Sequence, residues 1–369
     1  MNAPPARPLA AGATLGILGG GQLGRMLAMA AARLGLRTAI YEPAADCPAA
    51  GLASRHFAAA YDDAAALGDF ARACDVVTYE FENVPVAAAE AIAALTSVRP
   101  GPNALAVSQD RLAEKTFLRD LGIATVPFFA VDSAAALGAA LERCGGRGIV
   151  KTRRLGYDGK GQVALASAGE ADAAWHAIGR APAILEGFAD FAIEVSVVAA
   201  RHAAGRFAAF DPAWNEHEGG MLRRSRVPAP VSERVSEEAT AIARRILDAL
   251  DYCGVIGVEF FVTGEDRLLV NEIAPRVHNS GHWTEAACLI SQFEQHVRAV
   301  AGWPLGSTGR HSDCVMENLI GADVDRAPDL IGQGDCLVHL YGKAQTRPGR
   351  KMGHFTRLMA LGTAGWRHR

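Results

Sequence analysis

The sequence predicts a mixed α/β and α+β protein with three parts. Its 369 residues are enough for two or three domains with well-filled cores. Strand-like and helix-like segments alternate up to about residue 105, which is typical of a parallel sheet, whereas later strands follow one another as hairpins. We therefore expect a doubly wound Rossmann-like domain over 1–105, a central two-part domain over 106–302 with a lid at about 120–185, and a small β-rich domain over 303–369.

The N-terminal part has a β-α-β order. Strands are predicted at Thr14–Leu18, Arg37–Tyr41 and Val76–Tyr79. Each is followed by a predicted helix, at Gln22–Leu34, Ala64–Ala73 and Val86–Leu95 respectively. Gly19, Gly21 and Gly24 have the G-x-G-x-x-G spacing of a dinucleotide-binding turn, and Glu42 stands near the place of the ribose-binding acid. Such a turn also suits any other phosphate or carboxylate at a helix N-terminus, so an NAD-binding oxidoreductase is one open alternative.

Two acids follow the last predicted strand of this N-terminal part. Glu80 and Glu82 alternate at the end of a strand and so share one face, at the sheet edge where ligands bind in this fold class. Solvation of an exposed strand end is the simpler explanation for either acid alone.

The central part combines cations with a glycine-rich segment. Helix Gln109–Leu121 carries Arg111 and Lys115 one turn apart, helix Ser133–Cys144 follows, and Lys151 ends the apolar strand Ile149–Lys151. Since a lysine in a core strand is costly unless paired, we expect Lys151 to meet a charged ligand. The segment after this strand predicts either a flap whose amides close over phosphates or an ordinary hairpin; it consists of Gly156, Tyr157, Asp158, Gly159, Lys160, Gly161 and Gln162.

A later hairpin carries two further acids. Beyond the strands Ala183–Phe188, Ile193–Ala200 and Arg206–Asp211 and the helix Val231–Asp251 come two apolar strands, Val255–Val262 and Arg267–Ile273. Each contains one acid, Glu259 and Glu272, and the hairpin can place these opposite each other. Two facing carboxylates repel unless a cation lies between them, and Mg²⁺ prefers oxygen ligands, so we predict a magnesium site. A protonated or arginine-paired acid is the structural alternative.

Polar and cationic residues recur after this hairpin. Arg276, His278, Asn279 and Ser280 form a donor-rich irregular stretch suited to an oxyanion. Two further cations follow, Lys343 in LYGK and Arg350 in RKMGH. We expect strands Cys336–His339 and Phe355–Met359 to flank these motifs. The chain has only five lysines among 37 cationic residues, and all five lie in such motifs. We therefore interpret these five lysines as positions where a slim, flexible ammonium group is needed rather than a broad guanidinium group.

Composition excludes several classes of protein. The net charge of −3 argues against a nucleic-acid-binding surface. Seven scattered cysteines without a C-x-x-C pair indicate free thiols in a reducing compartment, and we predict a cytoplasmic protein. Apolar runs fall well short of the roughly 18 residues that a membrane span needs.

The order of these motifs resembles the ATP-grasp superfamily. Lys151, GYDGKGQ, Glu186, VEF around Glu259 and NEI around Glu272 carry that resemblance. GGGQLGRM, TYEFENV, QDRLAEK, APRVHNSGH, YGK and RKMGH are similar, within it, to the 5-(carboxyamino)imidazole ribonucleotide synthetases. The resemblance spans about residues 14–360 and implies ATP- and bicarbonate-dependent carboxylation of 5-aminoimidazole ribonucleotide through carboxyphosphate, in purine biosynthesis. It also implies a homodimer without nucleic-acid or membrane partners.

The resemblance also implies roles for individual residues. Those expected at ATP are Arg111, Lys151, Gly156, Tyr157, Asp158, Gly159, Lys160, Gly161, Gln162, Glu186, Gly187, Phe188, Ala189, Glu194, His217, Asn271 and Glu272. Those expected at the ribonucleotide are Gln22, Leu23, Glu82, Tyr157, Asp158, His278, Asn279, Ser280, Lys343 and Arg350. Glu259 and Glu272 would hold Mg²⁺. The catalytic candidates are Arg276, which would meet bicarbonate or carboxyphosphate, with Lys343, Tyr157, Asp158 and His278.

One departure and two alternatives stay open. Many ATP-grasp enzymes have asparagine two residues after the second metal-binding glutamate, where this chain has Ala274, so Asn271 or water would complete the coordination. A formate-dependent ATP-grasp ligase of purine synthesis would share most of the motifs. A non-catalytic nucleotide sensor would share the binding residues without turnover.

Overall fold

The computed structural model describes residues 8–156 and 161–366. Its N-terminal domain is a four-stranded parallel sheet with strand order β3-β2-β1-β4, which confirms the predicted doubly wound unit. The elements are β1 (Thr14–Leu18), α1 (Gln22–Arg33), β2 (Arg37–Tyr41), β3 (Arg55–Phe57), α2 (Ala64–Arg72), β4 (Val76–Tyr79), α3 (Val86–Ala93) and α4 (Pro102–Ser108). Strand β3 and helix α4 were not predicted from the sequence.

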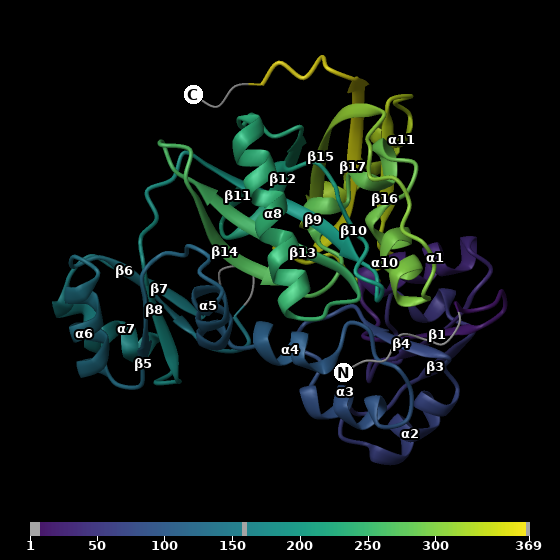
Figure 1. The fold of residues 1–369 in the computed structure, drawn as a ribbon, viewed down its shortest axis with the longest axis horizontal. Helices are drawn as coiled ribbons and strands as arrows, with labels where there is room; N and C mark the ends of the chain where they lie inside the picture. Colours follow the sequence, from purple (N-terminus) through teal and green to yellow (C-terminus); the bar gives the residue numbers. More distant parts are fainter. Residues whose placement is uncertain (1–7, 157–160, 367–369) are drawn as a thin grey trace.

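The lid is a second small sheet with helices on it. Its elements are β5 (Phe128–Val131), α6 (Ala134–Arg143), β6 (Gly148–Thr152), β7 (Gln162–Leu165), α7 (Ala171–Ala177) and β8 (Ala183–Gly187). The strands pair antiparallel in the order β5-β8-β6-β7, over a core that includes Leu141, Val150 and Leu185. Figure 1 shows the lid at the left, with α6 outermost and α5 (Arg111–Asp120) beside it.

The largest sheet runs through the rest of the molecule. Among the described residues it has nine strands, in the order β14-β13-β9-β11-β12-β15-β17-β16, with β10 on β9. The strands are β9 (Ile193–Arg201), β10 (Phe207–Ala209), β11 (Ala213–Glu218), β12 (Met221–Val227), β13 (Gly254–Val262), β14 (Leu268–Ala274), β15 (Ser312–Ile320), β16 (Cys336–Leu340) and β17 (Lys351–Ala360). The C-terminal strands β15–β17 thus continue the central sheet through the β12–β15 pairing.

Two helices hold this sheet in place. Helix α8 (Glu233–Ala249) begins at Ser232, whose hydroxyl accepts from the amide of Val235, and its buried face packs on β9, β13 and β14. Helix α10 (Gln292–Val300) packs on β13 and on α1, so it joins the sheet to the N-terminal domain. The remaining helices are α9 (Thr284–Ala287), α11 (Ala327–Ile331) and short 3₁₀ segments at Ala50–Leu52, Ala168–Glu170, Asn279–Gly281 and Gly321–Arg326.

One sequence-based boundary is corrected, and three strands are found that the sequence did not predict. The motif RKMGH does not precede a strand at Phe355, because β17 already begins at Lys351. Strands β11, β12 and β15 lie where no strand was predicted, since charged residues such as Glu216 and Arg224 interrupt their apolar pattern and pair across the sheet instead. Among the described residues no helix is both long and apolar enough to cross a bilayer.

Candidate active site

A cavity of about 900 Å³ lies where the three parts of the chain meet. Its walls include the first residues of α1, the segment after β4, the lid strands β6 and β7, the hairpin β13–β14 and the start of β17. The predicted site residues that line it are Gln22, Leu23, Glu82, Arg111, Lys151, Gly156, Gln162, Glu194, His217, Glu259, Asn271, Glu272, Arg276, His278, Asn279, Lys343 and Arg350. Residues up to 328 positions apart in sequence are thus brought to one cavity.

Some predicted site residues lie elsewhere. Gly161, Glu186, Gly187, Phe188, Ala189 and Ser280 are not among the residues that line this cavity. Phe188 lines a separate hollow on the lid together with Arg147. Tyr157, Asp158, Gly159 and Lys160 lie outside the described residues. Gly161 ends the β6–β7 connection at φ +69°, where a Cβ would meet the Thr152 hydroxyl at 2.7 Å, so this position requires glycine.

The two acids of the hairpin face each other. Glu259 of β13 pairs in register with Glu272 of β14. Burial and the Glu272 carboxylate raise the pKa of Glu259 to about 8. The nearest side chains are the neutral imidazole of His278, whose Nε2 lies 3.4 Å from Glu259, and the guanidinium group of Arg111, whose Nη1 lies 3.3 Å from Glu272. A divalent cation between the carboxylates would relieve their repulsion, so the donor set fits Mg²⁺, while the Arg111 contact shows that the arginine-paired alternative also has a basis.

A buried cationic network lies behind this pair. Lys151 donates to Glu186 at 2.6 Å, so its charge is balanced by a protein carboxylate. Lys115 lies 3.8 Å from the other Glu186 oxygen and donates to the carbonyl of Asn271 at 2.7 Å. Burial raises the pKa of Glu186, but the two lysines outweigh it and the pKa is lowered. The network therefore ties α5, the lid strands and the acid-bearing strand β14 together.

A histidine–glutamate pair closes one side of the cavity. His217 Nδ1 lies 2.8 Å from a Glu194 carboxylate oxygen. Burial lowers the pKa of His217, but Glu194, Glu259 and Glu272 raise it by a larger amount, so the net shift is upward. The three carboxylates around His217 are thus the physical cause of the upward shift of its pKa.

The glycine turn of the N-terminal domain is already occupied by acids. Glu80 accepts from the amides of Gly21 and Gly24 at 2.7 and 2.9 Å, and Glu42 accepts from the amide of Gly20 at 3.2 Å. These are the amides that would bind a dinucleotide pyrophosphate. A Cβ at Gly21 would lie 2.8 Å from Glu80, so glycine is needed for this approach of the carboxylate. The dinucleotide interpretation is therefore wrong, because the protein fills that site with its own side chain.

Glu82 has a different partner from Glu80. It forms a short ion pair with Arg276, which also donates to the carbonyl of Val277. Burial raises the pKa of Glu82, yet Arg276 outweighs it and lowers the pKa overall. The two acids that alternate at the end of β4 are thus both paired, one to backbone amides and the other to a cation of the cavity wall. Solvation of a free strand end does not describe either of them.

The segment His278–Ser280 contains side chains that line the cavity and one that does not. Ser280 is fully buried, and its hydroxyl lies between the Ser196 hydroxyl at 2.7 Å and His278 Nδ1 at 2.8 Å. We therefore correct its predicted role from substrate contact to orientation of the His278 ring. Burial and Arg276 lower the pKa of His278 to about 3, so the ring is neutral. Asn279 lines the cavity, and both polar atoms of its side chain are buried without a hydrogen-bond partner among the described residues.

The connection between β16 and β17 adds cations to the cavity wall. Lys343 donates to the carbonyl of Lys351 at 2.7 Å and lies over the Tyr341 ring at 5.5 Å. Arg350 donates to the carbonyl of Gln345 at 2.8 Å. Of the four lysines that the structure describes, Lys151, Lys343 and Lys351 line the cavity and Lys115 supports it. The scarcity of lysine was therefore an informative signal.

Sequence reasoning missed three supporting residues. Glu114 accepts from the amide of Ile273, and its pKa is raised to about 8 by burial and by Glu272. Lys115 was noticed as a lysine but was given no role, and Glu80 was given no partner. An acid or lysine at a helix position that the periodicity places inside is the signal that could have found Glu114 and Lys115.

Comparisons with known proteins agree with this arrangement. The chain matches models of the ribonucleotide synthetase preATP-grasp domain (residues 12–109), the ATP-grasp domain (116–293) and the phosphoribosylaminoimidazole carboxylase C-terminal domain (314–360). It is 60% identical to N5-carboxyaminoimidazole ribonucleotide synthase of Brucella melitensis, over 94% of this chain and 96% of the relative.

Solved structures give the same result. The synthetase from Thermus thermophilus is 45% identical over 94% of this chain and 93% of its own, with a TM-score of 0.87. The enzyme from Aspergillus clavatus, solved with ADP and 5-aminoimidazole ribonucleotide, is 30% identical over 95% of this chain and 94% of its own, with a TM-score of 0.89. The chain belongs to the N5-carboxyaminoimidazole ribonucleotide synthase family of ATP-grasp ligases.

Proposed function

We propose that this protein uses ATP and bicarbonate to carboxylate the amine of 5-aminoimidazole ribonucleotide in purine biosynthesis. The products are N5-carboxyaminoimidazole ribonucleotide, ADP and phosphate. The observation that carries the proposal is the facing pair Glu259 and Glu272, in one cavity with Arg111 and Lys151, in a chain of this family. An oxygen-rich pair that would suit a cation, beside two groups able to balance phosphate charge, supports the proposal.

The chemistry requires activation of bicarbonate. A bicarbonate oxygen attacks the γ-phosphorus of ATP, the bond to the ADP oxygen breaks, and carboxyphosphate forms. The substrate amine then attacks the carboxyl carbon, either of carboxyphosphate or of carbon dioxide released from it, and phosphate leaves. Such transfers depend on positioning and charge neutralisation, which Lys151, Arg111 and a closed glycine flap would supply. The amine proton would pass to Asp158, His278 or the released phosphate.

Glu259 and Glu272 would hold Mg²⁺, which supplies charge neutralisation between the phosphates of ATP when bound. Asn271 lines the same wall, whereas Ala274 offers no side-chain ligand, so Asn271 or water would complete the coordination. Arg276 would meet bicarbonate or carboxyphosphate. Its pairing with Glu82 fixes the guanidinium group at the wall between the acid-bearing hairpin and the N-terminal domain.

The ribonucleotide would bind between the N-terminal turn and the C-terminal strands. Gln22, Leu23, Glu82, His278 and Asn279 line one side, and the cations Lys343 and Arg350 line the other. Two cations suit the ribonucleotide phosphate, and the unsatisfied amide of Asn279 suits a polar ring or ribose group. A homodimer and a cytoplasmic location remain predictions.

Phosphate release from ATP tests the proposal. We expect release that depends on both bicarbonate and 5-aminoimidazole ribonucleotide, measured by omitting each in turn from purified protein. Replacement of bicarbonate by formate should give no turnover; turnover with formate would favour the formate-dependent ligase. Nucleotide binding without turnover would instead favour a sensor.

A further inference from the structure

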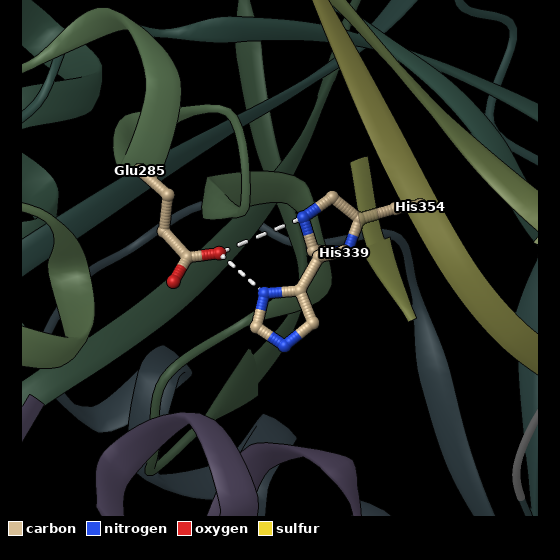
Figure 2. Close-up of side chains that lie close together, drawn as sticks. All are labelled: Glu285, His339 and His354. Atoms are coloured by element: carbon tan, nitrogen blue, oxygen red, sulfur yellow. Dashed lines mark ion pairs between the residues drawn. The ribbon is translucent and has the colours of Figure 1, made fainter. Parts of the chain in front are cut away.

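Glu285, His339 and His354 form a cluster outside the candidate active site. They come from α9, β16 and β17, and none of the three lines the large cavity. One ligand atom of each lies within 4.8 Å of the others. Figure 2 shows the Glu285 carboxylate directed at both imidazole rings. The convergence of two imidazoles and one carboxylate from three separate elements is the donor pattern of a metal centre.

The spacing fits a small metal ion. His339 Nδ1 lies 3.2 Å from Glu285 Oε2, and His354 Nε2 lies 3.7 Å from the same oxygen. Ligand atoms bound at about 2.0–2.2 Å around a tetrahedral zinc ion are separated by roughly 3.3–3.5 Å. Small side-chain rotations would therefore bring these atoms around one ion.

The hydrogen bonding of the cluster also points to a missing partner. Glu285 Oε2 is buried, yet it has no hydrogen bond of acceptable geometry among the described residues, although two imidazole nitrogens are near it. His354 is almost fully buried, and its Nδ1 is paired with the Tyr341 hydroxyl at 2.9 Å, which turns Nε2 toward Glu285. A hydrogen bond on the second ring nitrogen is the usual support of a metal-bound histidine.

We propose that Glu285, His339 and His354 bind one divalent transition-metal ion of the zinc class, which ties α9 to strands β16 and β17. Two nitrogen donors select against Mg²⁺, so this site differs in chemistry from the all-oxygen pair Glu259 and Glu272. Its role is structural. The ion would fix β16, which ends shortly before Lys343, and β17, which begins at Lys351, and so the part of the cavity wall that these lysines form.

Titration of metal-stripped protein with Co²⁺ and Zn²⁺ tests the proposal without reference to catalysis. We expect one equivalent of Co²⁺ to bind with visible d–d absorption and without the near-ultraviolet band of a thiolate ligand. Zn²⁺ should displace it and, at about 100 times its Kd, raise the melting temperature by about 3 °C or more. Mg²⁺ at millimolar concentration should do neither.

Variants locate the ion. Glu285→Gln keeps the size of the side chain, and we expect at least tenfold weaker Co²⁺ binding, with a similar loss for His339→Ala. His311→Ala removes an exposed histidine outside the cluster and should bind as the unaltered protein does. Absence of binding to the unaltered protein, a thiolate spectrum, or undiminished binding by folded Glu285→Gln would overturn the proposal. If both variants misfold, the stoichiometry and spectrum of the unaltered protein still decide it.

Discussion

Two pairs of acids in this molecule look alike in sequence but differ in how their charge is balanced. Glu80 and Glu82, at the end of β4, are paired with backbone amides and with Arg276. Glu259 and Glu272, on the β13–β14 hairpin, face each other, and burial together with Glu272 raises the pKa of Glu259. The first pair is complete within the protein, whereas the second gains from an added cation. Charge balance, more than burial, distinguishes structural acids from ligand-binding acids here.

The sharpest test of this difference is Glu272→Gln. We expect ATP turnover to fall by at least about 1,000-fold, because the substitution removes one of two proposed metal ligands. Stability should be unchanged or higher, since a negative charge is removed from beside Glu259 and Glu114. Phosphate release at saturating Mg²⁺ and thermal melting measure the two effects.

The matched control is Glu265→Gln, which lies exposed in the turn of the same hairpin and pairs with Arg267. It should retain full activity. Near-normal phosphate release by Glu272→Gln would show that the facing pair is an arginine-paired structural element, and the contrast with Glu80 and Glu82 would fail.

Glu186 provides an intermediate case, because its charge is balanced by two lysines. Lys115→Met leaves Lys151 in place but removes one partner and the bond to the Asn271 carbonyl. We expect a loss of about 2–3 kcal/mol of stability and a rise of about tenfold in the KM for ATP, because β14 loses one of its links to α5 and Glu186 loses one of its two cationic partners. Denaturant unfolding and steady-state kinetics measure these quantities.

Arg119→Met is the control on the same helix, with a side chain that is 61% exposed. A loss of less than about 0.5 kcal/mol is expected there. If Lys115→Met lost as little stability as Arg119→Met, Lys151 alone would be enough to balance the charge of Glu186. The hydrogen bond from Lys115 to β14 would then make no measurable contribution to stability.

The opposite outcome to Glu272→Gln is expected for Glu80→Gln. The amide group that replaces one carboxylate oxygen cannot accept from both Gly21 and Gly24, so about 1–2 kcal/mol of stability should be lost. The KM for the ribonucleotide should rise, because Gln22 and Leu23 directly follow Gly21 at the start of α1, while the KM for ATP stays constant. Glu90→Gln, exposed on α3, is the control. An equal rise of both KM values would contradict the separation of the two acid pairs.

These cases show which features the sequence could predict. The hairpin and the facing of Glu259 and Glu272 followed from local pattern, because strand periodicity and a short turn fix which side chains oppose each other. The partner of Glu80 could not be found in this way. Gly21 and Gly24 lie 59 and 56 residues away, and the same glycine spacing serves a bound phosphate equally well.

Long-range pairing limited the rest of the prediction. The strand pairing β12–β15 joins the central and C-terminal segments, and no local pattern encodes it. Ser280 was expected at the substrate because it stands in a polar motif, yet the fold turns its hydroxyl to Ser196, which lies 84 residues away. For residues such as Ser280, motif membership predicted the neighbourhood of the side chain but not the direction in which it points.

The most gradual expected effect is a change in the pH dependence of stability, spread over several pH units. The pKa of Glu114 is raised from 4.5 to about 8 by burial and by Glu272, so the folded state binds this proton more tightly than the unfolded chain does. Its contribution to stability is complete below the ordinary carboxyl range and is lost as the pH rises toward about 8. Metal-free protein should therefore melt at lower temperature at pH 8 than at pH 5.5.

Glu114→Gln should flatten this decline by at most about 1.4 kcal/mol per pH unit, since one titrating group is removed. Glu237→Gln, exposed on α8, should leave the slope unchanged. Mg²⁺ with ATP should also flatten the decline, because a cation between Glu259 and Glu272 lowers the repulsion that Glu114 experiences. Equal slopes in all three proteins would mean that the acids around β14 are already balanced without a ligand, as Glu80 and Glu82 are.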